Sequence, residues 1–187
     1  MEFAPPTGLN RGAPGLTLLP MRLLVLLTLL AGAVPGADWG PVQFLMGRWI
    51  GEGTGQPGTG SGGFSFATDL QGAVLVRKNY AEYPAANGNP GFRHDDLTII
   101  YRDESSHQLR AVYFDNEGHR IEYAVQPNGN GVVFTSEGPR TTIRYRFTYT
   151  RDGPDRLKIK FEIAEPGKDL APYIEATAHR DTAGPAQ

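Results

Sequence analysis

The histidines and carboxylates of this sequence are the residues whose types could support metal binding or acid–base chemistry. Three of them adjoin one another in His94-Asp95-Asp96, but neighbouring side chains on a strand point to opposite faces, so the three cannot converge without a bend. We therefore interpret this run as a solvated loop end at the start of a strand and predict no metal site. His119 is expected at a rim, where Asp115 and Glu117 could contribute only a weak cation site.

Sequence motifs for catalysis are equally sparse. No serine lies in a nucleophile elbow and no glycine-rich loop precedes a predicted helix, which excludes the P-loop and Rossmann patterns. The chain has no cysteine, so disulfides, thiolate metal sites and cysteine nucleophiles are excluded as well. Two glutamates facing each other across a cavity could act as acid and base, but Glu52 and Glu162 fall on faces expected to point outward. An enzyme acting on a lipophilic substrate stays an alternative without assigned catalytic residues.

Short runs of alternating polar and apolar residues, separated by turn residues, make up most of the chain after residue 46. The 24 glycines and 15 prolines lie largely between these runs, which is typical of an all-β protein. The predicted strands are Gly47–Thr54, Gly62–Leu70, Val74–Glu82, His94–Tyr101, Leu109–Phe114, Arg120–Gln126, Gly131–Glu137, Thr141–Thr150, Leu157–Ala164 and Tyr173–Arg180. Closure would hide the sheet edges, so we predict a ten-stranded antiparallel up-and-down β-barrel whose end is closed by the lead-in Trp39–Met46.

The first predicted strand carries Gly47, Trp49, Gly51 and Gly53 at every second position, so these four residues share one face. Glycine is unfavourable inside a strand because it costs entropy and packs against nothing. One interpretation is that the strand lines a hollow, with Trp49 closing one end and the glycines leaving room above it. The other is that Gly51 and Gly53 permit a sharp bend at a barrel corner. The two interpretations are compatible.

Strong alternation also identifies the inward face of several other strands. Ile143, Tyr145, Phe147 and Tyr149 share one face, and placing that face outside would expose a large hydrophobic patch. The residues expected to line the cavity are Trp49, Gly51, Gly53, Phe66, Tyr113, Tyr123, Tyr145, Phe147 and Phe161. The alternative is a filled interior, in which the tyrosine hydroxyls reach the rim and solvent.

Arg144 has two possible roles on the opposite face of its strand. It is expected to form a cross-strand ion pair with Glu162, which lies on the neighbouring predicted strand. If part of this polar face turned inward, Arg144 would instead bind a carboxylate of the ligand. We therefore include Arg144 among the candidate ligand-binding residues.

Gly47-Arg48-Trp49 resembles the Gly-x-Trp strand of the calycins, the superfamily of lipocalins and fatty-acid-binding proteins. In lipocalins an arginine at the end of the last strand covers that tryptophan, which implies a cation–π pair between Arg180 and Trp49 here. The stretches similar to a large family of bacterial lipocalin-like domains of unknown function are His94–Tyr101, Tyr113–Gly118, the strand around Arg144, Phe161-Glu162 and Arg180. The resemblance covers most of residues 44–180 and implies structural roles for Gly47, Trp49 and Arg180.

The longer pattern Gly47-x-Trp49-x-Gly51-x-Gly53 is similar to the opening strand of nitrobindins, which are ten-stranded haem-binding barrels. That resemblance implies an iron ligand on the last strand, where nitrobindins carry a histidine. The matching position lies near Tyr173, and His179 is the histidine on this strand. Tyrosine can be an axial haem ligand, so if haem binds we expect Tyr173 first and His179 second. No other cofactor is predicted.

The N-terminal region has the layout of a secretory signal peptide. Met21-Arg22 starts a short positively charged region, Leu23–Leu30 is almost entirely apolar, and Ala31-Gly32-Ala33 fits a cleavage site. We expect cleavage after Ala33 or Ala37 and export to the periplasm or the extracellular space. The expected segments are a disordered extension or misannotated start (1–20), the signal peptide (21–37), the barrel domain (38–180) and a disordered tail (181–187).

Charge and hydropathy restrict the partners. A net charge of −2 over 187 residues provides no field that would attract nucleic acid or anionic lipid. The apolar run near the N-terminus is too short to span a bilayer, so no membrane insertion of the mature chain is expected. The sequence therefore predicts an exported, monomeric barrel that binds a small, largely apolar molecule non-covalently in its interior.

Overall fold

The computed structural model describes residues 39–55, 60–86, 88 and 90–183, with backbone only for residues 52–55. Residues 1–37, which carry the expected extension and signal peptide, lie outside this range. The described residues form ten strands: β1 (Gly47–Gly55), β2 (Gly60–Asp69), β3 (Val74–Tyr83), β4 (Phe92–Arg102), β5 (Leu109–Asp115), β6 (Arg120–Asn128), β7 (Gly131–Ser136), β8 (Arg144–Arg151), β9 (Arg156–Ala164) and β10 (Ala171–Arg180).

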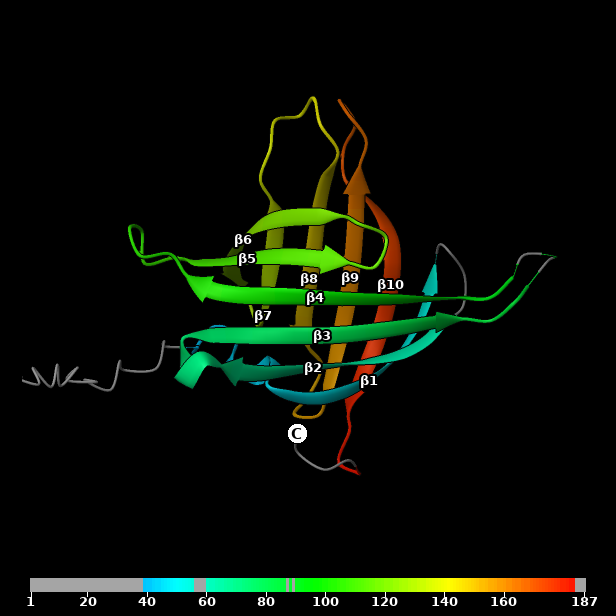
Figure 1. Cartoon of the computed structure of the whole chain (residues 1–187), viewed down its shortest axis with the longest axis horizontal. Coiled ribbons are helices and arrows are strands. Elements are labelled where there is room, and N and C mark those ends of the chain that lie inside the picture. Colours follow the sequence, from blue (N-terminus) through cyan, green and yellow to red (C-terminus); the bar gives the residue numbers. More distant parts are fainter. Residues whose placement is uncertain (1–38, 56–59, 87, 89, 184–187) are drawn as a thin grey trace, which may run out of the picture. The chain divides into compact units, whose positions relative to one another are not determined.

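These strands pair in sequence order, and β1 also pairs with β10, so the sheet closes into an antiparallel barrel. In Figure 1, β3, β4 and β5 cross in front of β8, β9 and β10 at a steep angle. Closure pairs both edges of the sheet and leaves no free strand edge between β1 and β10. The predicted ten-stranded up-and-down barrel, which is the calycin-like fold class, is confirmed.

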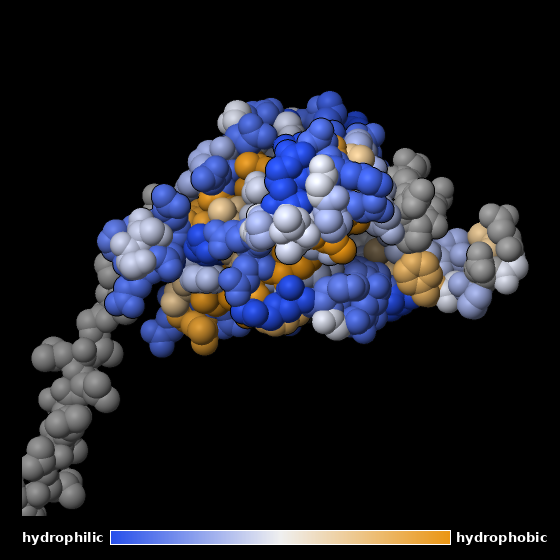
Figure 2. All heavy atoms as spheres, turned by 90° about the horizontal axis from the view of Figure 1, so that it is seen from above, coloured by the Kyte–Doolittle hydropathy of each residue, from blue (hydrophilic) through white to orange (hydrophobic). Residues whose placement is uncertain are grey.

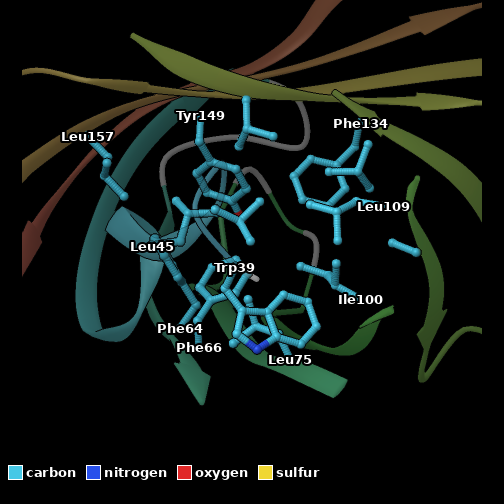
Figure 3. Close-up of a cluster of buried hydrophobic side chains, with 14 of the residues drawn as sticks. Trp39, Leu45, Phe64, Phe66, Leu75, Ile100, Leu109, Phe134, Tyr149 and Leu157 are labelled. Atoms are coloured by element: carbon cyan, nitrogen blue, oxygen red, sulfur yellow. The ribbon is translucent and has the colours of Figure 1, made fainter. Parts of the chain in front are cut away.

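One end of the barrel is closed by the segment that precedes β1. The short 3-10 helix Gln43–Leu45 follows Val42, and both Val42 and Leu45 are fully buried, with Trp39 beside them. Figure 3 shows Trp39 and Leu45 among side chains from the strand ends, including Leu75, Ile100 and Leu157. The lead-in predicted to close a barrel end therefore does so, by adding its own apolar side chains to the core.

The inferred contact between Arg180 and Trp49 is confirmed. Cζ of Arg180 lies 4.3 Å from the ring centroid of Trp49, a cation–π geometry. Nη1 of Arg180 donates to the carbonyl oxygen of Met46 at 2.8 Å, and Trp49 Nε1 donates to that of Leu45 at 2.8 Å. The end of β10 is thereby fastened to the start of β1, where the barrel closes.

The outer face of β8 and β9 carries an ion-pair cluster that differs from the predicted one. Arg146, rather than Arg144, is the partner of Glu162: its Nε and Nη2 atoms donate to the carboxylate at 2.6 and 2.8 Å. Nζ of Lys160 adds a contact at 3.3 Å. The predicted partner of Glu162 was wrong by two residues along β8. Alternation gives the face on which a residue lies but not the strand register, and the register places Arg146 opposite Glu162.

Two strand ends also differ from expectation. Ile143 was expected inside, but β8 begins one residue later and the Ile143 side chain is 51% exposed. In β10 a bulge between Pro172 and Ile174 shifts the register against β9. A bulge adds one residue to a strand and redirects side chains locally, and this one matters for the cavity described next. Polar residues cover most of the face seen in Figure 2, with hydrophobic atoms visible between them.

Candidate binding cavity

A cavity of about 500 Å³ lies inside the barrel, and residues from all ten strands line it. Its base is formed by the buried cluster around Trp39, Leu45 and Trp49. At the opposite end the lining includes Glu117 and His119, both of which are exposed. The volume falls within the range typical of small-molecule sites. The alternative prediction of a completely filled interior is therefore wrong.

One wall of the cavity is aromatic. Tyr145 and Phe161, from β8 and β9, stack with their rings 6.0 Å apart and nearly parallel, and Phe147 lies 5.7 Å from Phe161. Tyr173, from β10, packs edge-on against Phe161 at 6.1 Å. Phe64 and Phe66 of β2 continue this surface at right angles to each other. Flat rings at these spacings give the wall a large apolar area with tyrosine hydroxyls at a few points.

The facing wall, built by β3, β4 and β5, is polar and centred on Asp96. The Asp96 side chain is only 5% exposed, forms an ion pair with Arg77 Nη1, and accepts a hydrogen bond from Asn79 Nδ2 at 2.8 Å. His94 lies on the same face of β4, with Nε2 3.6 Å from an Asp96 oxygen. Because buried carboxylates are costly unless paired and hydrogen-bonded, this set of partners explains how Asp96 is tolerated inside the barrel.

A chain of hydrogen bonds continues from His94 to the exposed end of the cavity. His94 Nε2 is 3.0 Å from the Tyr113 hydroxyl, and Nδ1 is 2.8 Å from Oε1 of Glu117. The Tyr113 hydroxyl donates to Asp115 at 3.1 Å, and Asp115 in turn lies 2.8 Å from Nδ1 of His119. This chain, residues 94, 113, 115, 117 and 119, forms a polar strip from the cavity interior to its rim.

Burial and the neighbouring carboxylates, including Asp96, shift the pKa values of residues in the polar strip. The Asp96 carboxylate is the main cause that raises the pKa of His94 to about 9; burial opposes this rise and Glu117 adds to it. Burial, with the nearby Asp96 and Asp115 carboxylates, raises the pKa of the Tyr113 hydroxyl. His94 is therefore protonated at neutral pH, and it donates from both nitrogens.

Arg77 lies where the polar and aromatic walls meet. Its Cζ atom is 5.4 Å from the ring centroid of Phe64 and 5.6 Å from that of Phe147. Burial alone would lower the Arg77 pKa, but the Asp96 carboxylate and nearby tyrosine hydroxyls raise it. In the described structure Arg77 Nε and the Tyr149 hydroxyl are enclosed beside each other, and the interaction between the two side chains contributes to the raised Arg77 pKa. Arg77 lines the cavity with the remaining, 10% exposed part of its side chain.

Most of the residues that the sequence placed in the cavity do line it. They are Gly51, Phe66, Tyr113, Tyr123, Tyr145, Phe147 and Phe161. Trp49 is not among the lining residues; it lies in the base, where its ring stacks on Phe64 at 6.3 Å. Gly53 pairs with Gly60 and Ala176 in the sheet, but its surroundings lie outside the described residues.

Three other candidates have different outcomes. Arg144 does not line the cavity and its Nη2 atom donates to the carbonyl oxygen of Lys168, so a ligand-binding role is not supported by its position. His179 is exposed on the outer face of β10, between the inward-facing Ala178 and Arg180. Tyr173 does line the cavity, because the bulge next to it turns both Tyr173 and Ile174 inward.

The polar wall itself was missed by sequence reasoning. His94 and Asp96 were interpreted as a solvated loop end, but both lie within β4 and face the cavity, while Asp95 points outward to Arg93. Alternation in β4 places Asp95 and Asp96 on opposite faces. The apolar Ile100, which shares a face with Asp96 and is buried, is the signal that could have identified Asp96 as inward-facing. Among the described residues no cluster of histidine or acidic side chains has the arrangement of a metal site. His119 lies at the rim, as predicted.

The fold and the cavity together define a closed ten-stranded antiparallel barrel of the calycin type with a hollow interior. The structure of Rv2717c from M. tuberculosis is similar, with a TM-score of 0.53 and 15% identity over 76% of this chain and 96% of that one. The S-type phycobiliprotein lyase CPES from Guillardia theta gives a TM-score of 0.47 and 11% identity, covering 75% and 90% of the two chains. No family model and no curated relative matches the sequence. The first likeness shows the fold, and the lipocalin-like and nitrobindin-like resemblances stay predictions.

Proposed function

We propose that this protein binds a small, largely apolar molecule non-covalently in the barrel cavity, as an exported monomer. The observation that supports this proposal is the cavity of about 500 Å³, closed at its base and bounded on one side by a wall of aromatic rings. A large internal space is costly for a protein that gains nothing from it, because its lining loses packing contacts. Across the described residues no helix has the length and hydropathy needed to cross a membrane.

Haem is a less favoured occupant. Of the two ligands inferred from the nitrobindin resemblance, His179 points away from the cavity and Tyr173 faces it. His94 also faces the cavity, but both of its nitrogens are engaged by Glu117 and Tyr113. His119 lines the cavity only at its exposed rim, where its Nδ1 atom contacts Asp115, so inside the cavity the haem proposal depends on Tyr173. Hemin titration of a Tyr173→Phe variant tests it, and unchanged affinity would reject that ligand.

An enzyme acting on a lipophilic substrate is the second candidate, because titratable groups do face the cavity. Asp96 and His94 are both inward-facing, and acid–base catalysis needs such groups near a bound substrate. In this structure, however, Asp96 is surrounded by donors and His94 donates to two acceptors. Neither has an open position for proton transfer to a substrate, so binding without turnover is the better-supported function.

The proposed binding can be tested with a single substitution whose side chain fills part of the cavity. A Cβ atom added to Gly51 would meet nothing closer than 3.9 Å, and Gly51 lines the cavity. By contrast, a Cβ on its neighbour Gly62 would lie 2.2 Å from the Tyr80 carbonyl oxygen. Gly51→Leu is therefore expected to fold and to weaken binding of the neutral dye Nile red by about tenfold or more, measured by fluorescence titration.

Thr177→Leu is the matched control. Thr177 is exposed on the outer face of β10, so this substitution places the same leucine side chain outside the barrel. This variant is expected to bind Nile red as the unchanged protein does. Native mass spectrometry of the protein purified without added ligand would show whether a co-purified molecule is lost in Gly51→Leu alone. Equal dye affinity in all three proteins would contradict binding in the cavity.

Export forms a separate part of the proposal, based on the apolar run Leu23–Leu30 and the small residues up to Ala33. The expected N-terminus of the mature protein is Val34 or Asp38. Intact-mass measurement of protein recovered from the periplasm of an expression host tests this directly. Recovery of uncleaved protein from the cytoplasm alone would contradict export.

A further inference from the structure

We infer that the cavity selects a neutral aromatic molecule carrying a hydrogen-bond acceptor, such as an aryl ketone, and that it discriminates against carboxylates although a buried arginine lines it. This inference rests on the proposed function, since it names the chemical class of the ligand in the same cavity. Its three elements are the state of Arg77, the charges along the path to it, and the shape of the aromatic wall.

The charge of Arg77 is already neutralised within the protein. Its Nη1 atom pairs with Asp96, and the two side chains are only 10% and 5% exposed. A ligand carboxylate placed beside Arg77 would also lie near the Asp96 carboxylate, at low dielectric, where like charges repel strongly. The desolvation of that carboxylate would then lack a free counter-charge to offset it. An arginine in this state favours a neutral acceptor over an anion.

The rim and the polar strip reinforce this preference. Asp115 and Glu117 both line the cavity on the side where it reaches the exposed end. Together with Asp96 they provide three carboxylates, which are paired with Arg77 (Asp96), His94 (Glu117) and His119 (Asp115). An approaching anion therefore meets three carboxylates and, among the lining residues, no cation that lacks a carboxylate partner.

The remaining hydrogen-bond capacity indicates an acceptor on the ligand. A guanidinium has five N–H donors, and the hydrogen bond of Arg77 to a protein side chain in the described structure uses Nη1. Its Nε atom is enclosed in the wall beside the Tyr149 hydroxyl, so the donors that a ligand can reach belong to the exposed tenth of the Arg77 side chain, which lines the cavity. A donor that loses water when a ligand fills the cavity needs a new acceptor, and a carbonyl oxygen on the ligand supplies one without adding charge.

The aromatic wall favours a flat ligand. Tyr145 and Phe161 stack with an interplanar angle of 4°, and Phe147 adjoins them at 48° to Phe161. The Phe147 ring also lies next to Arg77, with Cζ 5.6 Å from its centroid, so the rings lead directly to the guanidinium. A planar ring system can contact these faces while its acceptor reaches the guanidinium.

The experiment compares three naphthalenes of similar size by displacement of Nile red at pH 7. They are 2-isopropylnaphthalene, which has no acceptor, 2-acetylnaphthalene, which adds a neutral carbonyl, and 2-naphthoate, which adds a carboxylate. The acetyl compound is expected to bind about 3- to 10-fold more tightly than the isopropyl compound, as one hydrogen bond provides. The carboxylate is expected to bind at least about tenfold more weakly than the acetyl compound.

The variant Asp96→Asn releases Arg77 from its counter-charge while keeping a side-chain oxygen for Asn79. In this variant 2-naphthoate is expected to bind more tightly than 2-acetylnaphthalene, which reverses the order. A folded variant with the original order would overturn the inference. If Asp96→Asn does not fold, the ranking in the unchanged protein still decides, because tighter binding of 2-naphthoate there also overturns it.

The two proposals fail in different ways. If Nile red binds but none of the three naphthalenes displaces it, the ligand class is wrong and the binding function stands. If Nile red binding is equal in Gly51→Leu and the unchanged protein, cavity binding itself is wrong. Equal affinities of the acetyl and isopropyl compounds would reject the acceptor and the role of Arg77.

Discussion

Asp96 determines the charge state of the polar wall, because three different side chains depend on it. Arg77 and Asn79 donate to its oxygens, and His94 lies 3.6 Å from one of them. Replacing such a residue costs more stability inside a barrel than on its surface, because water cannot take the place of the lost hydrogen-bond partner. The effect of Asp96 on His94 can be measured through the pH dependence of stability.

His94 is expected to stabilise the folded protein at neutral pH and to lose that effect at alkaline pH. Its pKa is raised from 6.5 to about 9, chiefly by Asp96, against the effect of burial and with help from Glu117. A group with a raised folded-state pKa contributes fully below its unfolded pKa, and the contribution disappears as pH rises through the folded value. The difference in free energy of unfolding between the unchanged protein and His94→Gln should therefore shrink between pH 6.5 and 9.

Urea denaturation of both proteins at pH 6 and pH 9.5 measures this difference. His107→Gln serves as the control, since it makes the same change in the exposed turn between β4 and β5, away from the polar strip. A stability difference for His94→Gln that is constant over this range would show that His94 is not held in its charged form.

At the level of elements, the order and pairing of the strands follow from patterns that the sequence displays openly. Tyr145, Phe147 and Tyr149 alternate with arginines and a threonine, so one face of β8 can only be interior. The glycines of the turns have positive φ, as at Gly118 and Gly153, which marks the strand ends. These signals are local, so they predict strands without knowledge of the neighbours.

The polar wall could not be predicted, because its strands do not show this alternation between a polar and an apolar face. In β3, Leu75, Arg77 and Asn79 face inward while Val74 and Val76 face outward, so alternation gives no contrast between the faces. A rule that places polar residues outside fails where a cavity needs them inside. The inward turn of Tyr173 depends on a bulge against β9, which is a property of two strands together and cannot be seen in either alone.

The junction between β1 and β10 is expected to be sensitive to a methyl group at Gly47. Gly47 has φ +109°, and an added Cβ would lie 2.6 Å from Nη1 of Arg180, which is held by Trp49 and the Met46 carbonyl. Gly47→Ala therefore adds the displacement of Arg180 to the backbone strain, which is itself about 1–2 kcal/mol. We expect a larger loss in the free energy of unfolding than for Gly153→Ala, where φ is +100° and no atom lies within 4 Å.

Chemical denaturation in an Arg180→Met background separates the two contributions. With the guanidinium absent, Gly47→Ala should cost about as much as Gly153→Ala, which makes the coupling between positions 47 and 180 visible as a double-mutant cycle. Equal costs in both backgrounds would mean that the clash is relieved elsewhere and that Arg180 does not constrain Gly47.

The barrel as a whole combines two walls with different physical roles. The aromatic wall contributes burial of apolar surface, which stabilises the fold. The polar wall places an ion pair at low dielectric, where the loss of hydration offsets most of the attraction between the charges. Replacing a buried ion pair by apolar residues of similar volume is often neutral for stability, so the polar wall fits the proposed ligand recognition better than a role in folding.

This division predicts different effects of removing one or both charges. Arg77→Met leaves the Asp96 carboxylate buried with Asn79 and His94 alone, and should lower the free energy of unfolding by about 3–5 kcal/mol. Arg77→Met combined with Asp96→Asn removes both charges and keeps an oxygen for Asn79, so its stability should lie within about 1 kcal/mol of the unchanged protein. Urea denaturation measures both, and Nile red displacement by the acetyl and isopropyl naphthalenes measures recognition in the double variant. That variant should bind the two compounds equally, since it keeps the aromatic wall and lacks the guanidinium donors. A double variant as unstable as the single one would show instead that the ion pair is needed to fold the barrel.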